Sequence, residues 1–214
     1  MDVFDAVRRN DLAALKTALP DAASASGPDG ASLLMYAAYV GNTEAVTLIR
    51  GALPTLSPHE AIILGDLPAL DSALDTGWTP ATLSPDGFPP LALAVFFRQP
   101  AIFERLLPLT PDVDARATNP QQVAAIHAAI AVRNHAALEQ LLRAGAAPDL
   151  PQQNGITPLQ AAARHGDTVA CALLVLFGAS VALPDDSGQS PIEHAEAGGH
   201  DWLARLLTGF ARPA

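Results

Sequence analysis

The chain has 214 residues, of which 50% are apolar, only 5% aromatic and 16% charged, and alanine alone supplies about a fifth of it. A core built from such small side chains favours closely packed helices. The net charge of -10 and the pI near 4.8 disfavour nucleic acid and anionic membranes as partners, because both are themselves negatively charged.

The single cysteine, Cys171, excludes an internal disulfide and a thiolate metal site, which is typical of a reducing compartment. The first residues, MDVFDAVRRND, lack the basic and apolar regions of a secretory signal. The longest nearly apolar run, from Val169 to Leu183, is shorter than the ~20 residues that a membrane-spanning helix needs. We therefore expect a cytoplasmic protein, and the high alanine content, with Lys16 as the only lysine, favours a bacterial source.

A pair of small or apolar residues, followed after two residues by Gly or a substitute for it, recurs about every 33 residues. The pairs begin at Ala6, Ala37, Ala61, Ala94, Ala129, Ala162 and Ala195. This period is typical of stacked helical hairpins. It predicts a single all-α domain over 1–214, with an N-terminal capping unit over 1–26 and repeats over 27–55, 56–82, 83–118, 119–151, 152–184 and 185–214.

Two units near the N-terminus depart from the common pattern. The first unit is rich in polar residues, including Arg8, Arg9 and Lys16, as expected of a solubilising cap. The interval from Ala37 to Ala61 is about nine residues short of the period, and the segment ALPTLSPHEAI within it has no Gly-containing turn. We therefore expect the third unit to lack its projecting turn, or finger, and to leave a gap in the edge that the fingers form.

Local residue chemistry predicts where the helices start and turn back. Thr157-Pro158 and Ser190-Pro191 place a hydroxyl at the N-cap and a proline at the first helical position. Gly at the end of each first helix suits the left-handed backbone of a tight reversal, at Gly41, Gly65, Gly166 and Gly199. Turn dipeptides precede several first helices and predict projecting fingers, at Asp29-Gly30, Asp86-Gly87, Asn154-Gly155 and Ser187-Gly188.

The central units contain both regular and irregular features. Their second helices have an apolar face at three- and four-residue spacing, at Phe103, Leu106 and Leu107 and at Leu138, Leu141 and Leu142. Arg98 and Arg133 replace the turn Gly, so these turns need another geometry or an arginine at positive φ. The segment from Asp114 to Gln122 has no Gly, and we expect an irregular finger in the fifth unit.

The clearest units read NGITPLQAAARHGDTVACALLVLFGAS from Asn154 and SGQSPIEHAEAGGHDWLARLLTGF from Ser187. They resemble the ankyrin repeat, whose pattern has a turn with Gly, then T-P-L-H-x-A-A-x-x-G-H, then an apolar helix ending in L-L-x-x-G-A. The resemblance extends over essentially the whole chain, because the phase is kept between units. It implies an ankyrin-repeat solenoid that binds a partner protein, and it assigns His59 and His127 to hydrogen bonds with the backbone of neighbouring turns.

No residue pattern favours catalysis or a cofactor, and we expect neither an enzyme nor a metal site. His165, His194 and His200 have no usual zinc spacing. Cys171 lies among apolar residues, where a thiol acts as a small core side chain. Asp185-Asp186 is expected to be a solvated turn, because too few oxygen donors surround it for a calcium loop. No phosphate loop, nucleophile elbow or dinucleotide fingerprint is present.

The resemblance places the two residues after each small pair on the concave groove, together with residues next to the finger Gly. These positions include a central apolar stripe and a polar end, and the predicted partner-binding residues are Tyr39, Val40, Ile63, Leu64, Phe88, Phe96, Phe97, Val132, Arg164 and His165. A contiguous apolar stripe is unusual on a free surface. The alternative is that Phe96 and Phe97 fill a void beside the irregular third unit, or that one is buried and one exposed.

The sequence is compatible with three kinds of function. The first is a monomeric module that binds an unidentified protein segment in its groove, without cofactor or chemistry. Within that class, the acidity suggests a stoichiometric inhibitor of a basic partner such as a toxin. The others are an enzyme or metal-binding protein that uses the C-terminal histidines, and a subunit whose groove is covered by a second copy.

Overall fold

A computed structural model of the chain describes residues 2–210. Residue 1 and residues 211–214, which belong to the predicted units 1–26 and 185–214, lie outside the described residues. Within 2–210 all regular elements are helical, apart from an isolated bridge between Ser26 and Ser32. The helices are α1 (Val3–Arg8), α2 (Leu12–Ala22), α3 (Leu33–Tyr39), α4 (Thr43–Ala52), α5 (Pro58–Leu64), α6 (Leu67–Asp75), α7 (Pro90–Phe96), α8 (Pro100–Leu106), η1 (Leu107–Leu109), α9 (Ala125–Ala131), α10 (His135–Arg143), η2 (Gln153–Gly155), α11 (Pro158–Arg164), α12 (Thr168–Leu176), α13 (Pro191–Ala197) and α14 (Asp201–Phe210).

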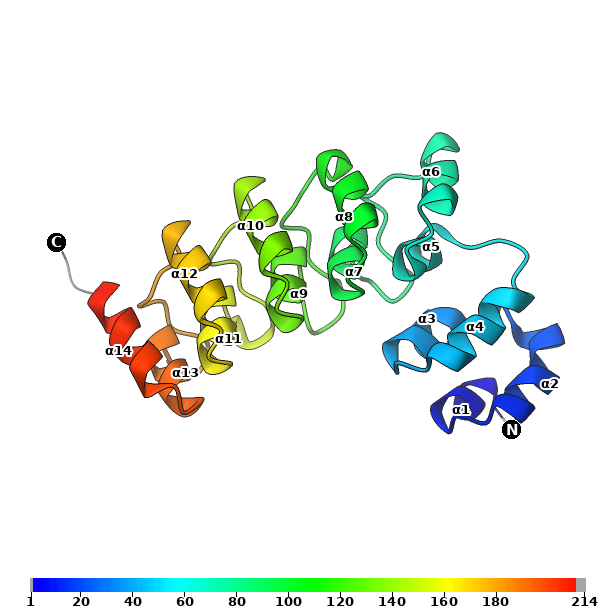
Figure 1. The fold of residues 1–214 in the computed structure, drawn as a ribbon, viewed down its shortest axis with the longest axis horizontal. Coiled ribbons are helices and arrows are strands. Elements are labelled where there is room, and N and C mark those ends of the chain that lie inside the picture. The colour runs from blue at the N-terminus through cyan, green and yellow to red at the C-terminus, as the bar shows by residue number, and fades with distance from the viewer. Residues whose placement is uncertain (1, 211–214) are drawn as a thin grey trace.

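The α-helices form successive antiparallel pairs that stack in a row, with α1 and α14 at opposite ends of the stack (Figure 1). The first helices of the pairs contact one another in the order α1, α3, α5, α7, α9, α11 and α13, and the second helices form the other layer. The structure confirms the predicted all-α solenoid. Each predicted unit contains one helix pair, and the residue boundaries between units remain a prediction. None of the helices within 2–210 is long and apolar enough to cross a bilayer.

The predicted helix starts are confirmed. The Thr157 side chain accepts a hydrogen bond from the Gln160 N–H at 3.3 Å, while the Gln160 side chain accepts one from the Thr157 N–H at 2.7 Å. Ser190 and Glu193 form the same reciprocal capping box at the start of α13. Each box satisfies two N–H groups that the first turn leaves without partners. The short first helices are therefore defined by local hydrogen bonds as well as by packing.

The turns inside the pairs follow the left-handed backbone predicted for them. Gly41, Gly65, Gly166 and Gly199 all have positive φ. Arg98 and Arg133 adopt the same conformation, with φ of 55° and 51°. Such a backbone is strained for a residue with a Cβ, but both guanidinium groups bond to the next unit. Arg98 donates to the Val132 carbonyl, and Arg133 Nη2 donates to the His165 carbonyl at 3.0 Å.

The core runs between the two helical layers and is built largely of alanine and leucine. Leu138, Leu141 and Leu142 of α10 are buried together, as predicted. On α8, Phe103 and Leu106 are buried, whereas Leu107 is only half-buried and begins the 3-10 turn η1. The predicted apolar face of that helix therefore ends one residue earlier than the spacing suggested, because the chain tightens into η1 before Pro108.

The fingers are hairpins closed by backbone hydrogen bonds over 27–31, 84–88, 117–123, 152–156 and 185–189. The hairpin over 117–123 is longer than the others and places Gln122 at a φ of 52°, so the predicted irregularity in the fifth unit is confirmed. Later fingers are joined by backbone bonds from Thr118 N–H to the Gly87 carbonyl and from Gln153 N–H to the Gln121 carbonyl. The fingers thus form a continuous edge.

The third unit has no finger, because only a short link separates α4, ending at Ala52, from α5, beginning at Pro58. The expected gap in the edge is nevertheless absent. The finger over 27–31 reaches the finger over 84–88 directly, so closely that a Cβ on Gly30 would lie 2.8 Å from the Pro85 carbonyl oxygen. Losing one finger therefore draws its two neighbours together, and the prediction of a gap was wrong.

Candidate functional site

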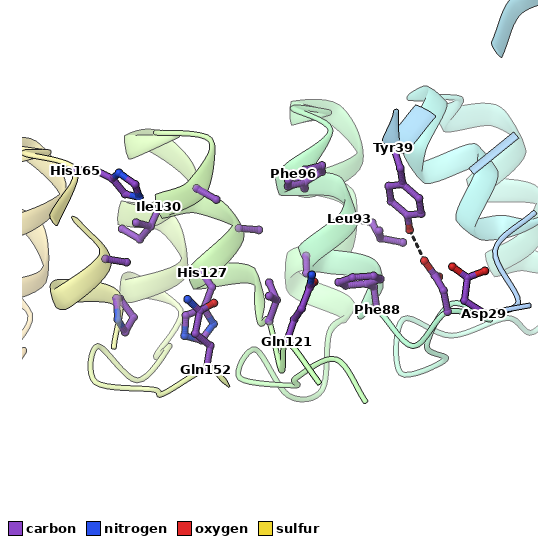
Figure 2. A pocket seen from close by; sticks show the side chains of 17 residues that line it. Asp29, Tyr39, Phe88, Leu93, Phe96, Gln121, His127, Ile130, Gln152 and His165 are labelled. Carbon is purple, nitrogen blue, oxygen red and sulfur yellow. Dashed lines mark hydrogen bonds between the residues drawn. The ribbon is translucent and has the colours of Figure 1, made fainter. Parts of the chain in front are cut away.

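A concave pocket of about 500 Å³ lies where the first helices and the fingers meet (Figure 2). Its wall comes from α3, α7, α9 and α11 and from the fingers before them. The volume is within the ~300–1,000 Å³ that ligand sites usually occupy. Four of the predicted partner-binding residues line it: Tyr39, Phe88, Phe96 and His165. Other residues that line the pocket were not among the predicted partner-binding residues, chiefly Asp29, Asp86, Leu93, Gln121, Ile130 and Gln152.

Tyr39 connects the two halves of the pocket. Its hydroxyl donates to Asp86 Oδ2 at 2.7 Å, across the position of the missing finger. Its ring lies 6.3 Å from that of Phe88 and 5.6 Å from that of Phe97, measured between centroids. Burial raises the pKa of Tyr39 well above its usual value, and the bond to Asp86 and the charges of Asp86 and Asp29 raise it further. The hydroxyl therefore stays protonated and acts as a donor.

Phe96 and Phe97 have different environments. Phe96 is 46% exposed and faces the pocket, whereas Phe97 is half-buried and packs on the apolar cluster of Ala31, Met35 and Ile63. The two rings meet edge to face at 5.3 Å. One phenylalanine thus belongs to the surface and the other to the junction beside the third unit, which is the mixed arrangement left open above.

The remaining predicted residues lie outside the pocket. Val40 and Arg164 are exposed, and Leu64 and Val132 are half-buried. Ile63 is only 3% exposed, because the side chains of Tyr39 and Phe97 pack with it in the junction cluster. Its assignment to the binding surface is therefore corrected: Ile63 is a core residue.

His59 and His127 make the backbone contacts expected of them. His127 Nε2 donates to the Leu150 carbonyl at 2.8 Å, while its Nδ1 accepts from the Ala124 N–H at 3.0 Å. His59 Nε2 donates to the Thr82 carbonyl at 3.0 Å. Burial lowers the pKa of His127 to about 4, despite the opposing effect of the Leu150 carbonyl, and Arg116 lowers it further. Although His127 lines the pocket, both ring nitrogens are committed to structural bonds.

We expect His127→Gln to reduce the acid sensitivity of folding. Unfolded His127 takes up a proton below pH ~6.5 and the folded residue only near pH 4, so acid favours the unfolded chain across this window. In the original chain, this effect should lower the free energy of unfolding by about 2–3 kcal/mol between pH 7 and pH 4. The equivalent residue of the next unit, Gln160, makes both bonds with an amide, at 2.7 Å to Thr157 N–H and 2.9 Å to the Leu183 carbonyl.

Urea unfolding of both proteins between pH 7 and pH 4 measures the difference. Because the carboxylates are the same in both proteins, the difference between their free energies of unfolding as a function of pH is due to His127. Equal losses in the two proteins would contradict the neutral, buried state of this histidine.

The C-terminal histidines do not converge on one site. His165 lines the pocket, while His200 packs against the turn at Gly166. His194 is buried and donates from Nε2 to Asp185 Oδ2 at 2.9 Å. Within 2–210 no group of three or more His, Cys, Asp or Glu side chains is arranged to hold a metal ion. Cys171 is buried, and burial raises its pKa to about 12, which disfavours the reactive thiolate.

Asp185 was expected in a solvated turn, and this was wrong. Its side chain is buried and accepts hydrogen bonds from the hydroxyl and N–H of Ser187, from the Gln189 N–H and from His194. The bonds from the Ser187 hydroxyl and the Gln189 N–H are the main causes that hold the pKa of Asp185 well below its usual range. The buried side chain of Asp185 therefore stabilises the last finger through these hydrogen bonds.

Comparison with known proteins agrees with the repeat architecture. Residues 125–212 match the family model described as ankyrin repeats (3 copies). A search of curated proteins found no match. Ankyrin repeats are in general modules for protein–protein interaction. The match shows that residues 125–212 consist of ankyrin repeats, and the stacked helix pairs and their fingers continue the same architecture through the rest of residues 2–210.

Proposed function

We propose that this protein binds a segment of another protein in the concave pocket and performs no chemistry of its own. The observation that carries the proposal is Phe96, a large apolar side chain held exposed in a hollow of about 500 Å³. Aromatic side chains in such hollows commonly supply most of an interface's binding energy. Tyr39 and Phe88 extend the apolar wall, and His165 lies at the other end of the pocket.

The pocket is also suited to binding because its wall is preformed. Phe96 belongs to α7, which is packed between α5 and α9, and its ring rests edge to face on Phe97. A side chain that is already held in place loses little conformational freedom on association. Val40, Leu64, Val132 and Arg164 are proposed as peripheral contacts. A monomer in the cytoplasm remains the expected state.

A selection from random short peptides displayed on phage tests this function. We expect peptides selected on the purified chain to bind Phe96→Ala at least about tenfold more weakly, a loss of roughly 1.4 kcal/mol, because buried aromatic anchors commonly supply much of the binding energy. Phe210→Ala is the matched control, because Phe210 is 58% exposed on α14, which lies far along the stack from α7, the helix that carries Phe96 (Figure 1). Selected peptides that bind both variants as well as the original chain would contradict the proposal.

A further inference from the structure

The pocket has a one-sided charge. Its lining contains two carboxylates, Asp29 and Asp86, and neither lysine nor arginine. His127, which also lines it, stays neutral near pH 7 because its pKa is about 4. Within residues 2–210 neither Asp29 nor Asp86 has a Lys, Arg or His nitrogen within 4.0 Å. The pocket is therefore an apolar hollow with uncompensated negative charge at one end.

These two carboxylates are brought together by the missing finger of the third unit. Asp29 lies in the finger over 27–31 and Asp86 in the finger over 84–88, and the two fingers touch at Gly30 and Pro85. Asp29 and Asp86 both line the pocket, and the charges of both act on the Tyr39 hydroxyl, which donates to Asp86 Oδ2 (Figure 2). With a finger between them, the two charges would belong to separate parts of the edge.

Local hydrogen bonds hold both carboxylates in place without neutralising them. Asp86 Oδ2 accepts from the Tyr39 hydroxyl and Oδ1 from the Ser84 hydroxyl, and Asp29 Oδ1 accepts from the Ala31 N–H at 3.2 Å. A carboxylate has about four acceptor sites, so each retains capacity for a further donor. Next to them stand the aromatic rings of Tyr39 and Phe88.

We propose that the pocket selects a peptide segment with an arginine, whose guanidinium lies between Asp29 and Asp86 and beside the rings of Tyr39 and Phe88, while an apolar neighbour packs on Phe96. Charge complementarity favours this occupant. A planar guanidinium offers several N–H donors to carboxylates and also stacks on aromatic faces. Cations are attracted to the face of an aromatic ring, and an adjacent carboxylate adds to that attraction. The proposal rests on the proposed function and specifies the chemistry of the partner.

The test uses peptides selected on the purified chain and their counterparts with each arginine replaced by citrulline, which has nearly the same shape but no charge. We expect selected peptides to contain arginine, and the replacement to weaken binding to the original chain about tenfold. On Asp29→Asn/Asp86→Asn the same replacement should change affinity by less than about twofold, because the carboxylates that recognise the charge are gone. Asp29→Asn alone keeps the bonds of Asp86 to Tyr39 and Ser84. On this variant the citrulline replacement should weaken binding by an intermediate factor.

Asp21→Asn/Asp75→Asn is the matched control, because it removes the same net charge from exposed positions outside the pocket. It should leave the effect of citrulline unchanged. Selected peptides that depend on Phe96 but contain no arginine, or whose citrulline forms lose affinity equally on the Asp29→Asn/Asp86→Asn variant, would overturn this inference and leave the proposed function standing. A selection that yields no Phe96-dependent peptide would overturn both.

Discussion

Leu141→Ala is expected to lower the free energy of unfolding by about 2–5 kcal/mol. Leu141 is fully buried on α10, which packs against α9 and α12. Truncating it removes apolar contacts and leaves a cavity that the short, tightly packed helices cannot fill. In a stack where each unit contacts only its neighbours, the loss should also reduce the stability of the adjoining helices.

Urea unfolding measures the change in the free energy of unfolding of the whole chain. Hydrogen exchange of the backbone amides in α12 measures how far the helix of the next unit is destabilised. Leu176→Ala is the matched control, because Leu176 is 78% exposed at the end of α12 and the chemical change is identical. We expect the control to change stability by less than about 0.5 kcal/mol. A loss below about 1 kcal/mol for Leu141→Ala would be inconsistent with the packed core described above.

Phe97→Ala should destabilise the fold by about 2–3 kcal/mol, somewhat less than the ~3–5 kcal/mol of a fully buried phenylalanine. Phe97 packs on Tyr39 and on the junction cluster that contains Ile63, where the second and third units meet. Removing its ring weakens this junction, and no finger of the third unit reinforces it.

The neighbouring variant Phe96→Ala separates stability from binding. Because the Phe96 ring faces the pocket, its loss should cost less than about 1 kcal/mol in unfolding experiments while abolishing most peptide affinity. Thermal and urea unfolding of Phe96→Ala and Phe97→Ala under the same conditions measure the difference in stability between the two variants. Similar destabilisation by both would mean that Phe96 is as structural as Phe97 and that the binding surface lies elsewhere.

Much of the fold could be predicted because its determinants are local. Thr157 and Ser190 cap helices through residues three positions away, and Gly166 adopts positive φ within its own turn. Arg98 and Arg133 were predicted at positive φ as one of two alternatives, because they occupy the position of the turn Gly in a repeating pattern. The assignment of His127 to a backbone bond came instead from the resemblance to the ankyrin repeat.

The candidate site was less predictable, because it depends on distances between units that are not adjacent in the sequence. The resemblance to the ankyrin repeat placed Tyr39, Phe96 and His165 on the groove, because they follow the small pairs, and all three line the pocket. The positions next to the finger Gly include Asp29 and Asp86, but the repeat pattern did not indicate that these two carboxylates would line the same pocket. The shortened interval before Ala61 was the only sign that these two fingers would meet. It was interpreted as a gap in the row of fingers, whereas the fingers on either side of it are in direct contact.

The sequence by itself determined the repeating hairpin, its caps and its turns, because each is stabilised by hydrogen bonds and backbone preferences within a few residues. Only the tertiary structure decided that Ile63 is buried, that Phe97 supports the junction while Phe96 faces the pocket, and that Asp185 is enclosed by its own finger. The enclosure of Asp185 depends on hydrogen bonds within its own unit, whereas the burial of Ile63 and the placement of the two phenylalanines follow from how closely neighbouring units approach once one finger is missing. That spacing is a property of packing, which a local pattern of residues does not encode.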